Sequence, residues 1–389
     1  MGITKRHLPV KKISAGPKHH FFGYFDKYPW DRSGRYLLAH ETDFTGRQPE
    51  SGEKAGICLI DLCDNNKLTR IAESSAWCWQ QGAMLQWLND SDDEIIFNDR
   101  EGDSFVSRIM NIKTQKMRTL CRPVYCLSPD GQWALSLNFS RLDTERPGYG
   151  YPGLTDIAKG VWHPDFDGLW LLDLKKNTAK LVISIDQIVQ TFHREEMDNV
   201  MSWFNHILFS PDSRRFAFFH RWRVGTRHLT HMFTANIDGS DIYPLNLEDM
   251  SSHYTWISAK QIINFSNRHA DGWQYHLFTD KTDKIETIAQ DVFPGDGHCS
   301  YSTDSKWMLT DCYPSAPDYQ RKLFLYNLSR RDAYEIGSFY SDPSYPTPTR
   351  CDLHPNWARD NSQVCIDSIH EGERQVYIID LNEIVDTNS

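Results

Sequence analysis

The sequence predicts an all-β protein: a seven-bladed β-propeller of four-stranded antiparallel blades, closed by the N-terminal strand. Three observations predict this fold class. A hairpin motif occurs seven times, a second strand motif follows each hairpin, and a spare strand precedes the first repeat. The blades of a propeller are four-stranded sheets around a central channel, so repeats of this kind at a regular spacing are its signature.

The first repeat is a β-hairpin. An aromatic or aliphatic residue leads into a polar turn of Asp, Gly, Ser or Asn, and a run of strand-forming residues follows, as around SPDG at residues 128–131. The seven copies cover residues 28–40, 85–97, 125–137, 207–219, 254–265, 300–311 and 356–368.

The second repeat is a strand that ends in Asp-Leu or a close variant, followed by a polar turn and a last short strand. Its seven copies cover residues 56–62, 107–112, 168–174, 231–237, 273–280, 322–328 and 375–381. The period of roughly 40 to 57 residues is typical of propeller blades. The one longer interval predicts an insertion at residues 139–166 in blade three.

The last blade lacks its outer strand, because only eight residues follow Leu381. Residues 7–13, HLPVKKI, have the β-branched alternation of an edge strand and are predicted to complete blade seven, which removes an exposed strand edge. The repeats run from end to end without a Pro- or Ser-rich linker. We therefore expect a single domain over residues 1–389.

The amino-acid composition limits the kinds of partner that the protein is expected to bind. The formal net charge of −10 argues against nucleic acid, because phosphate binding needs clustered positive charge. No stretch approaches the ~18 apolar residues of a membrane span, so no membrane partner is expected. The nine scattered cysteines and the N-terminus, which lacks an apolar signal-peptide core, predict a cytoplasmic location.

Four histidines occupy equivalent places in successive blades, just before or within the innermost strand: His206, His253, His298 and His354. Innermost strands line the channel, so these side chains are predicted to converge. Taken singly, each is more readily explained as a hydrogen-bonded structural histidine. The convergence of four favours a functional site.

Cys351 and His354 have the spacing C-x-x-H, and His298 precedes them by one blade. These three residues predict a divalent metal site. A thiolate with imidazoles favours zinc over manganese. Asp296 or Asp352 is expected to orient a ligating imidazole.

Three further regions are rich in side chains that bind anions or sugars. The run at residues 220–231 in blade four is the densest basic cluster, and its bland interpretation is a solvated loop. For the motif at residues 18–30, a functional role and aromatic packing explain the residues equally well, and for the loop at residues 138–153 the alternatives are a functional role and an ordinary surface loop. The candidates for catalysis are Arg223, Arg227 and His231, and those for substrate binding are His19, His20, Tyr24, Arg141, Arg146, Tyr149, His220 and Arg221.

The order SSHYTW, GDGHCSYSTDSKW and CDLHPNW on consecutive blades resembles the oligogalacturonate lyase family, seven-bladed propellers that cleave uronic-acid glycosides. The resemblance implies that His253 is the active-site histidine and that His298 and His354 are metal ligands. Cys351 stands where the family has a glutamine ligand. Ulvan lyases are a second relative by architecture.

Two departures from the family pattern bear on the metal and the base. Asn356 replaces the last histidine ligand, and sulfur at Cys351 replaces an oxygen ligand, which puts the family's manganese in doubt. The family's catalytic arginine lies on the blade before the H-x-x-W histidine, where this chain has His231 with Arg223 and Arg227 upstream.

The expected function is therefore a metal-assisted lyase that acts on an acidic oligosaccharide or polysaccharide by β-elimination. His253 is the first candidate for the base, with His231 and His206 as alternatives. No G-x-S-x-G motif is present, which disfavours a propeller peptidase. The paired carboxylates of a glycosidase remain possible. The competing hypothesis from another class is a non-catalytic TolB-like binding or scaffold module.

Overall fold

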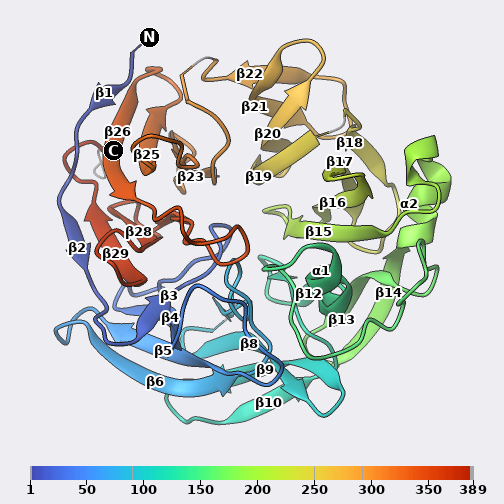
Figure 1. Cartoon of the computed structure of the whole chain (residues 1–389), viewed down its shortest axis with the longest axis horizontal. Helices are drawn as coiled ribbons and strands as arrows, with labels where there is room; N and C mark the ends of the chain where they lie inside the picture. The colour runs from blue at the N-terminus through green and yellow to red at the C-terminus, as the bar shows by residue number, and fades with distance from the viewer. Residues whose placement is uncertain (1, 90, 249, 291, 386–389) are drawn as a thin grey trace.

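Seven sheets follow one another around a central axis in the order of the chain (Figure 1). The computed structural model describes residues 2–89, 91–248, 250–290 and 292–385. Residues 1 and 386–389, the ends of the predicted domain, lie outside the described residues. The predicted fold class, a seven-bladed propeller of antiparallel blades, is confirmed.

In the first five blades the strands run outward from the axis in chain order, and in blades six and seven only the outermost strand comes from elsewhere, the N-terminus. Blades one to three are β3 (His19–Phe21), β4 (Tyr36–Thr42), β5 (Ala55–Asp61), β6 (Lys67–Ser74); β7 (Gln86–Trp87), β8 (Glu94–Glu101), β9 (Ser104–Asn111), β10 (Met117–Leu120); and β11 (Cys126–Leu127), β12 (Trp133–Ser136), β13 (Gly168–Asp173), β14 (Thr178–Ser184). Blades four and five are β15 (Ser202–Phe209), β16 (Arg215–Val224), β17 (Arg227–Asn236), β18 (Tyr243–Asn246); and β19 (Met250–Ser258), β20 (Gln261–Arg268), β21 (Gly272–Thr279), β22 (Ile285–Ile288). Blades six and seven are β23 (Ser300–Tyr301), β24 (Trp307–Asp311), β25 (Gln320–Asn327), β26 (Ala333–Tyr340); and β27 (Asn356–Trp357), β28 (Gln363–Ser368), β29 (Gln375–Asp380).

The recurrent Ser-x-Asp turn explains why the hairpins form where they do. In blade three the Ser128 hydroxyl donates to the Asp130 carboxylate at 2.6 Å and accepts the Trp133 backbone N–H at 2.9 Å. Gly131 supplies the positive φ of 72° that closes the turn. Ser210 and Ser302 make the same pair of contacts in blades four and six.

The N-terminal segment closes the ring, as predicted. β2 (Val10–Lys12) pairs antiparallel with β29 and becomes the fourth strand of blade seven. A contact that the sequence does not predict precedes it: β1 (Thr4–Lys5) pairs parallel with β26, so blade six has five strands.

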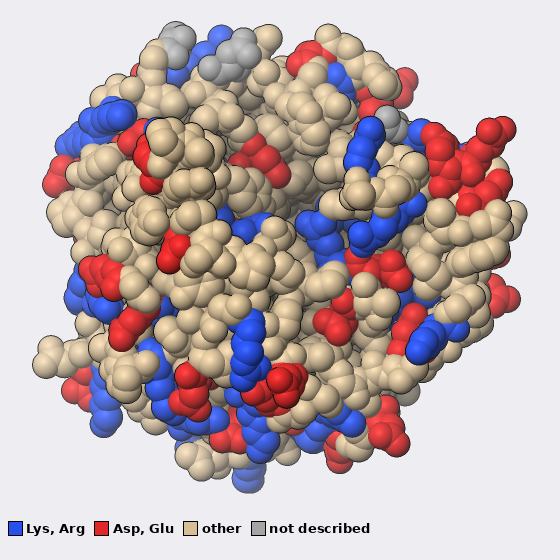
Figure 2. All heavy atoms as spheres, viewed as in Figure 1, with Lys and Arg blue, Asp and Glu red and all other residues tan. Residues whose placement is uncertain are grey.

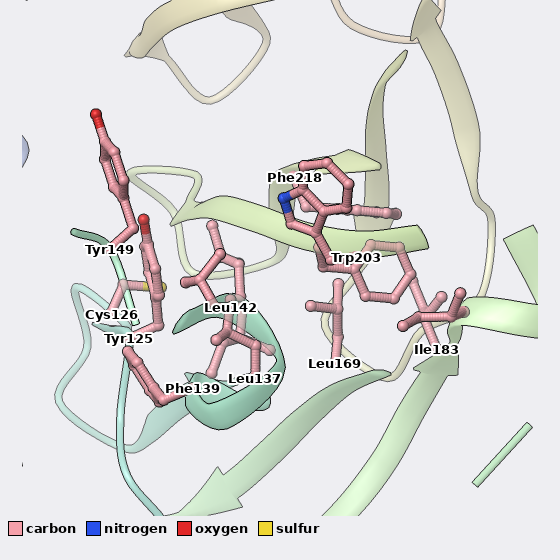
Figure 3. Close-up of a cluster of buried hydrophobic side chains, with 14 of the residues drawn as sticks. Tyr125, Cys126, Leu137, Phe139, Leu142, Tyr149, Leu169, Ile183, Trp203 and Phe218 are labelled. Carbon is pink, nitrogen blue, oxygen red and sulfur yellow. The ribbon is translucent and has the colours of Figure 1, made fainter. Parts of the chain in front are cut away.

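The insertion of blade three lies between β12 and β13 and carries the helix α1 (Phe139–Glu145). Asn138 caps this helix by accepting the Arg141 backbone N–H at 3.0 Å. Figure 3 shows Phe139 and Leu142 of α1 among the side chains between blades three and four, beside Trp203 of β15. The insertion is thus anchored in a buried core next to the channel.

The other helices are short. α2 (Ile185–Thr191) and a 3₁₀ turn, Glu195–Met197, link blades three and four. Within the described residues, no helix is both long enough and apolar enough to span a membrane.

Candidate functional site

The innermost strands of neighbouring blades run in the same direction, so residues at the start of each strand meet at one end of the channel. The four predicted histidines do converge there: the ring centroids lie 4.2 Å apart for His253 and His298, 4.5 Å for His298 and His354, and 6.3 Å for His206 and His253. We call this the histidine end. Trp87, Trp256 and Trp357, which come later in their blades' inner strands, mark the opposite or tryptophan end.

His298 has the hydrogen bonding of a metal-ligating histidine. Its Nδ1 lies 2.9 and 3.0 Å from the two carboxylate oxygens of Asp311, which also accepts the His298 backbone N–H at 2.7 Å. The Nε2 atom is buried and has no hydrogen-bond partner. Burial alone would raise the pKa of Asp311, but His298 lowers it overall. The carboxylate therefore fixes the ring with Nε2 free to bind a cation.

His354 and Asp352 complete a group of potential ligands with His298. One ligand atom from each of these three residues lies within 4.8 Å of the others. The Nε2 of His354 is buried and also lacks a partner. Burial, and then the neighbouring His298, holds the pKa of His354 well below its usual value, so the ring is neutral, the form that coordinates metals.

Asp352 is held by two arginines. Its carboxylate contacts Arg321 at 2.5 Å and the Nε of Arg350 at 2.9 Å. Burial opposes ionisation, but the two guanidinium groups keep the pKa of Asp352 well below its usual range. Two imidazoles and a charged carboxylate, all buried, are a donor set that fits a divalent cation.

The structure does not bring Cys351 into this group. Its Sγ lies 3.9 Å from the backbone oxygen of Asp352, and burial raises the pKa of the thiol to about 11. Asp352, and not the predicted Cys351, is the third potential ligand. The preference for zinc rested on a thiolate ligand, so it loses its support.

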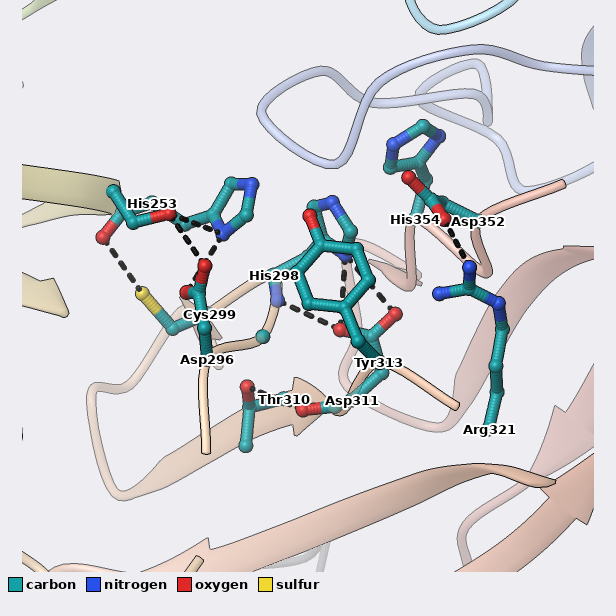
Figure 4. A network of polar contacts seen from close by, with 12 residues as sticks. His253, Asp296, His298, Cys299, Thr310, Asp311, Tyr313, Arg321, Asp352 and His354 are labelled. Atoms are coloured by element: carbon teal, nitrogen blue, oxygen red, sulfur yellow. Dashed lines mark hydrogen bonds and ion pairs between the residues drawn. The ribbon is translucent and has the colours of Figure 1, made fainter. Parts of the chain in front are cut away.

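His253 forms a second carboxylate–imidazole pair beside the first. Its Nδ1 lies 3.0 Å from the Asp296 carboxylate, which also accepts the Ser252 hydroxyl at 2.5 Å (Figure 4). Burial lowers the pKa of His253 overall, although Asp296 opposes this shift. A neutral imidazole that donates from Nδ1 keeps Nε2 as a proton acceptor. Figure 4 shows Tyr313 between His298 and Arg321.

Residues 22–28, the channel segment, form the floor of the site. Asp367 of blade seven accepts the backbone N–H groups of Phe22 at 2.9 Å and Gly23 at 3.2 Å. Gly23 has a φ of 131°, and a Cβ there would lie 3.2 Å from the Gln81 backbone. This turn brings the Tyr24 ring within 5.3 Å of His206 and the Phe25 ring within 5.3 Å of His298.

A basic wall faces the histidines from blade four and the insertion. Arg221 is 3% exposed, and its Nε and Nη1 have no hydrogen-bond partner. Burial, and then the nearby Arg146, lowers its pKa to about 10. Arg146 lies over the ring of Tyr149, which is in edge contact with His206. Figure 2 shows Lys and Arg side chains, together with Asp and Glu, around the hollow in the middle of the face that it displays.

The structure places the remaining candidates away from this cluster. His20 bonds to Gln375 and Glu41, and His19 accepts the Arg374 N–H, both at the junction of blades one and seven. Arg141 binds Asp156 and the Trp162 backbone oxygen within the insertion, and the Ser202 backbone oxygen of β15. The remaining four candidates belong to blade four. His220 and His231 are buried and pack against Trp222. Arg223 donates to the Glu145 backbone oxygen, and Arg227 is exposed.

Sequence reasoning missed Asp311, Tyr313, Arg321 and Arg350, which hold or flank the central histidines. Asp311 could have been predicted from the sequence, since it is the last residue of the repeated hairpin at residues 300–311, and this hairpin follows His298. Arg321 begins the next strand of the same blade and has no local motif.

No family model matches the chain, and no curated protein matches it. Two solved structures match over its full length: an oligogalacturonate lyase from Vibrio parahaemolyticus (14% identity, 98% of this chain and 96% of that one, TM-score 0.69) and an oligogalacturonate lyase in complex with manganese (15%, 98% and 95%, TM-score 0.71). The propeller domain of the Trilobed protease from Pyrococcus furiosus matches at 10% identity over 92% and 96%, with a TM-score of 0.53. At these identities the likeness is one of fold.

Proposed function

We propose that this protein is a lyase that cleaves uronic-acid glycosides in an oligosaccharide or polysaccharide by β-elimination, with the help of a divalent cation. The observation that carries the proposal is the pair His253–Asp296 set 4.2 Å, ring to ring, from the potential metal ligand His298. The likeness in fold to two structures named oligogalacturonate lyase, one of them with manganese, supports it.

β-Elimination at a uronate has three requirements. The carboxylate must be neutralised so that the C5 proton becomes acidic, a base must take that proton, and the leaving oxygen at C4 must receive one. The histidine end offers a group for each of these tasks within one buried volume.

Positive charge comes from two sides. His298, Asp352 and His354 would hold the cation, and a divalent cation supplies the charge that stabilises the developing enolate of the carboxylate. Arg221 offers the second positive charge, since part of its guanidinium has no partner within the protein. The donor set contains no sulfur, so we propose a divalent cation without a preference for zinc.

The proton transfers fall to residues beside these charges. His253 Nε2 takes the C5 proton, the C4–O bond breaks as the C4–C5 double bond forms, and the Tyr313 hydroxyl protonates the leaving oxygen. Burial raises the pKa of Tyr313 well above its usual value, so the hydroxyl keeps its proton until it is needed. Its ring lies 6.2 Å from that of His253.

A screen of uronate oligosaccharides tests the activity, because the new double bond of the product absorbs in the ultraviolet. His253→Ala should lower turnover by about 10²-fold or more, as loss of a general base does. His269→Ala is the matched control, because His269 belongs to the same blade but is exposed on an outer turn. Equal turnover in both variants would remove His253 from the role of base.

Elemental analysis of the purified protein tests the cation. We expect one divalent ion per chain and its loss in His354→Ala. If acidic oligosaccharides bind but no unsaturated product forms with any of them, the protein is a binding module of the same fold.

A further inference from the structure

The tryptophan end of the channel holds a second cavity system that the proposed chemistry does not use. Two adjoining cavities of about 320 and 520 Å³ share the residues Asp26, Lys27, Tyr28 and Trp256. Cavities of this size hold small ligands. The larger one also contains Trp87, whose Nε1 donates to the Pro29 backbone at 2.9 Å and so fixes the ring.

Arg359, which lines the larger cavity, is a cation without a direct ion-pair partner among the described residues. It makes no hydrogen bond or ion pair with another described residue, and its Nε is buried and unpartnered. Its guanidinium lies 4.7 Å from the ring centroid of Tyr28, which is 42% exposed. Burial lowers the pKa of Arg359, although Tyr28, Asp31 and Asp92 oppose this shift. A half-buried guanidinium of this kind is stabilised by a bound anion.

The remaining lining of the larger cavity combines aromatic rings with hydrogen-bonding groups. The rings of Tyr28, Trp87 and Trp256 offer apolar faces, and Gln86, Asn89 and Thr255 lie among them with polar groups. The side-chain nitrogens of Gln86 and Asn89 each donate to a backbone carbonyl. The amide oxygens of the two side chains take no part in these hydrogen bonds. Flat apolar faces interleaved with hydrogen-bonding groups suit a pyranose ring.

We propose that the tryptophan end is a second binding site for an acidic sugar, with the sugar carboxylate on Arg359 and the ring against Tyr28 and Trp256. The choice of a uronate as ligand rests on the function proposed above. The channel segment lies between this site and the histidine end. Tyr24 packs against His206, Phe25 contacts His298 and also lines the smaller far cavity, and Asp26 and Tyr28 line both far cavities.

Calorimetric titration of the full chain with glucuronate, alongside glucose and sulfate, tests the site. We expect two sites in the unaltered protein. Arg359→Gln should weaken the second by about tenfold or more, as loss of a charged hydrogen bond does, and should leave turnover unchanged. Arg221→Gln should weaken only the site at the histidine end.

Arg330→Gln is the matched control. Arg330 belongs to blade six and also lies over an aromatic ring, that of Trp307, but it forms an ion pair with Asp332 of the same blade. Tyr28→Ala, a change at an exposed ring, repeats the test without altering a charge. The proposal is overturned if Arg359→Gln binds glucuronate as the control does, or if glucose or sulfate binds as tightly as glucuronate. A protein without lyase activity that still loses one glucuronate site in Arg359→Gln would refute the proposed function and uphold this site.

Discussion

The N-terminal segment should contribute several kcal/mol to stability, because it ties three blades together. The Arg6 and Leu8 backbone N–H groups donate to β26 of blade six, at 2.9 and 3.0 Å. Ile13 donates to Val376 of blade seven at 3.0 Å. Leu8 packs in the core between blades six and seven, and Ile13 in the core between blades seven and one.

Leu8 and Ile13 are 5% and 2% exposed, so Leu8→Ala and Ile13→Ala should each lower the free energy of unfolding by about 2–4 kcal/mol. The two residues lie in separate clusters, so the double variant should show nearly the sum. Deletion of residues 2–14 should cost at least as much, because it also leaves β29 with an unpaired edge.

Equilibrium unfolding in urea, followed by tryptophan fluorescence, measures these changes. Lys11→Ala is the control: Lys11 lies on the same strand but is exposed, so its change should stay within about 0.5 kcal/mol. If Leu8→Ala and Ile13→Ala were as mild as this control, the segment would not close the ring in solution, and the reasoning from its burial would be refuted.

Three further outcomes follow from single contacts. Ser128→Ala should destabilise the protein by about 1 kcal/mol in urea, since it removes the hydroxyl that ties Asp130 to Trp133; an unchanged midpoint would contradict this. Arg141→Met should cost about 3–5 kcal/mol and open the insertion to limited proteolysis, because it leaves Asp156 buried and unpaired, whereas resistance equal to that of the unaltered protein would show that the pair is dispensable. The unfolding free energy should fall as the pH drops from 6.5 to about 4, because burial lowers the pKa of His40 to about 4 in the folded state while the unfolded state takes up the proton. Between pH 6.5 and 4, the free energy of unfolding of His40→Gln should fall by up to about 3 kcal/mol less than that of the unaltered protein. If the variant showed the same pH dependence, His40 would not be the source of the effect.

The blades could be predicted because their information is local. Each hairpin carries its own turn residues, such as Ser128 and Gly131, and these contacts form within six residues of one another. The pairing of β1 with β26 has no such signal. It joins Thr4 and Lys5 to Tyr334 and Glu335, more than 300 residues away, through backbone hydrogen bonds that any sequence can make.

The site was predictable where it depends on equivalent positions and unpredictable where it depends on side-chain direction. His298 and His354 meet because both precede an inner strand. In an extended chain, neighbouring residues point to opposite sides, so C-x-x-H spacing cannot tell whether Cys351 or Asp352 joins them. The same alternation in β16 sends His220 into the core of the blade and Arg221 towards the channel.

Burial of the histidine end favours both metal binding and proton transfer by its histidines. The channel segment places Tyr24 and Phe25 beneath the imidazoles, and this desolvation lowers the pKa of His206, His253 and His354. Neutral imidazoles can coordinate a cation or accept a proton, whereas imidazolium can do neither. The same exclusion of water would strengthen the attraction between Arg221 and the carboxylate of the proposed substrate. One floor segment, held by Asp367 through two backbone N–H groups, therefore supports both the base and the positive charge on which the proposed β-elimination depends.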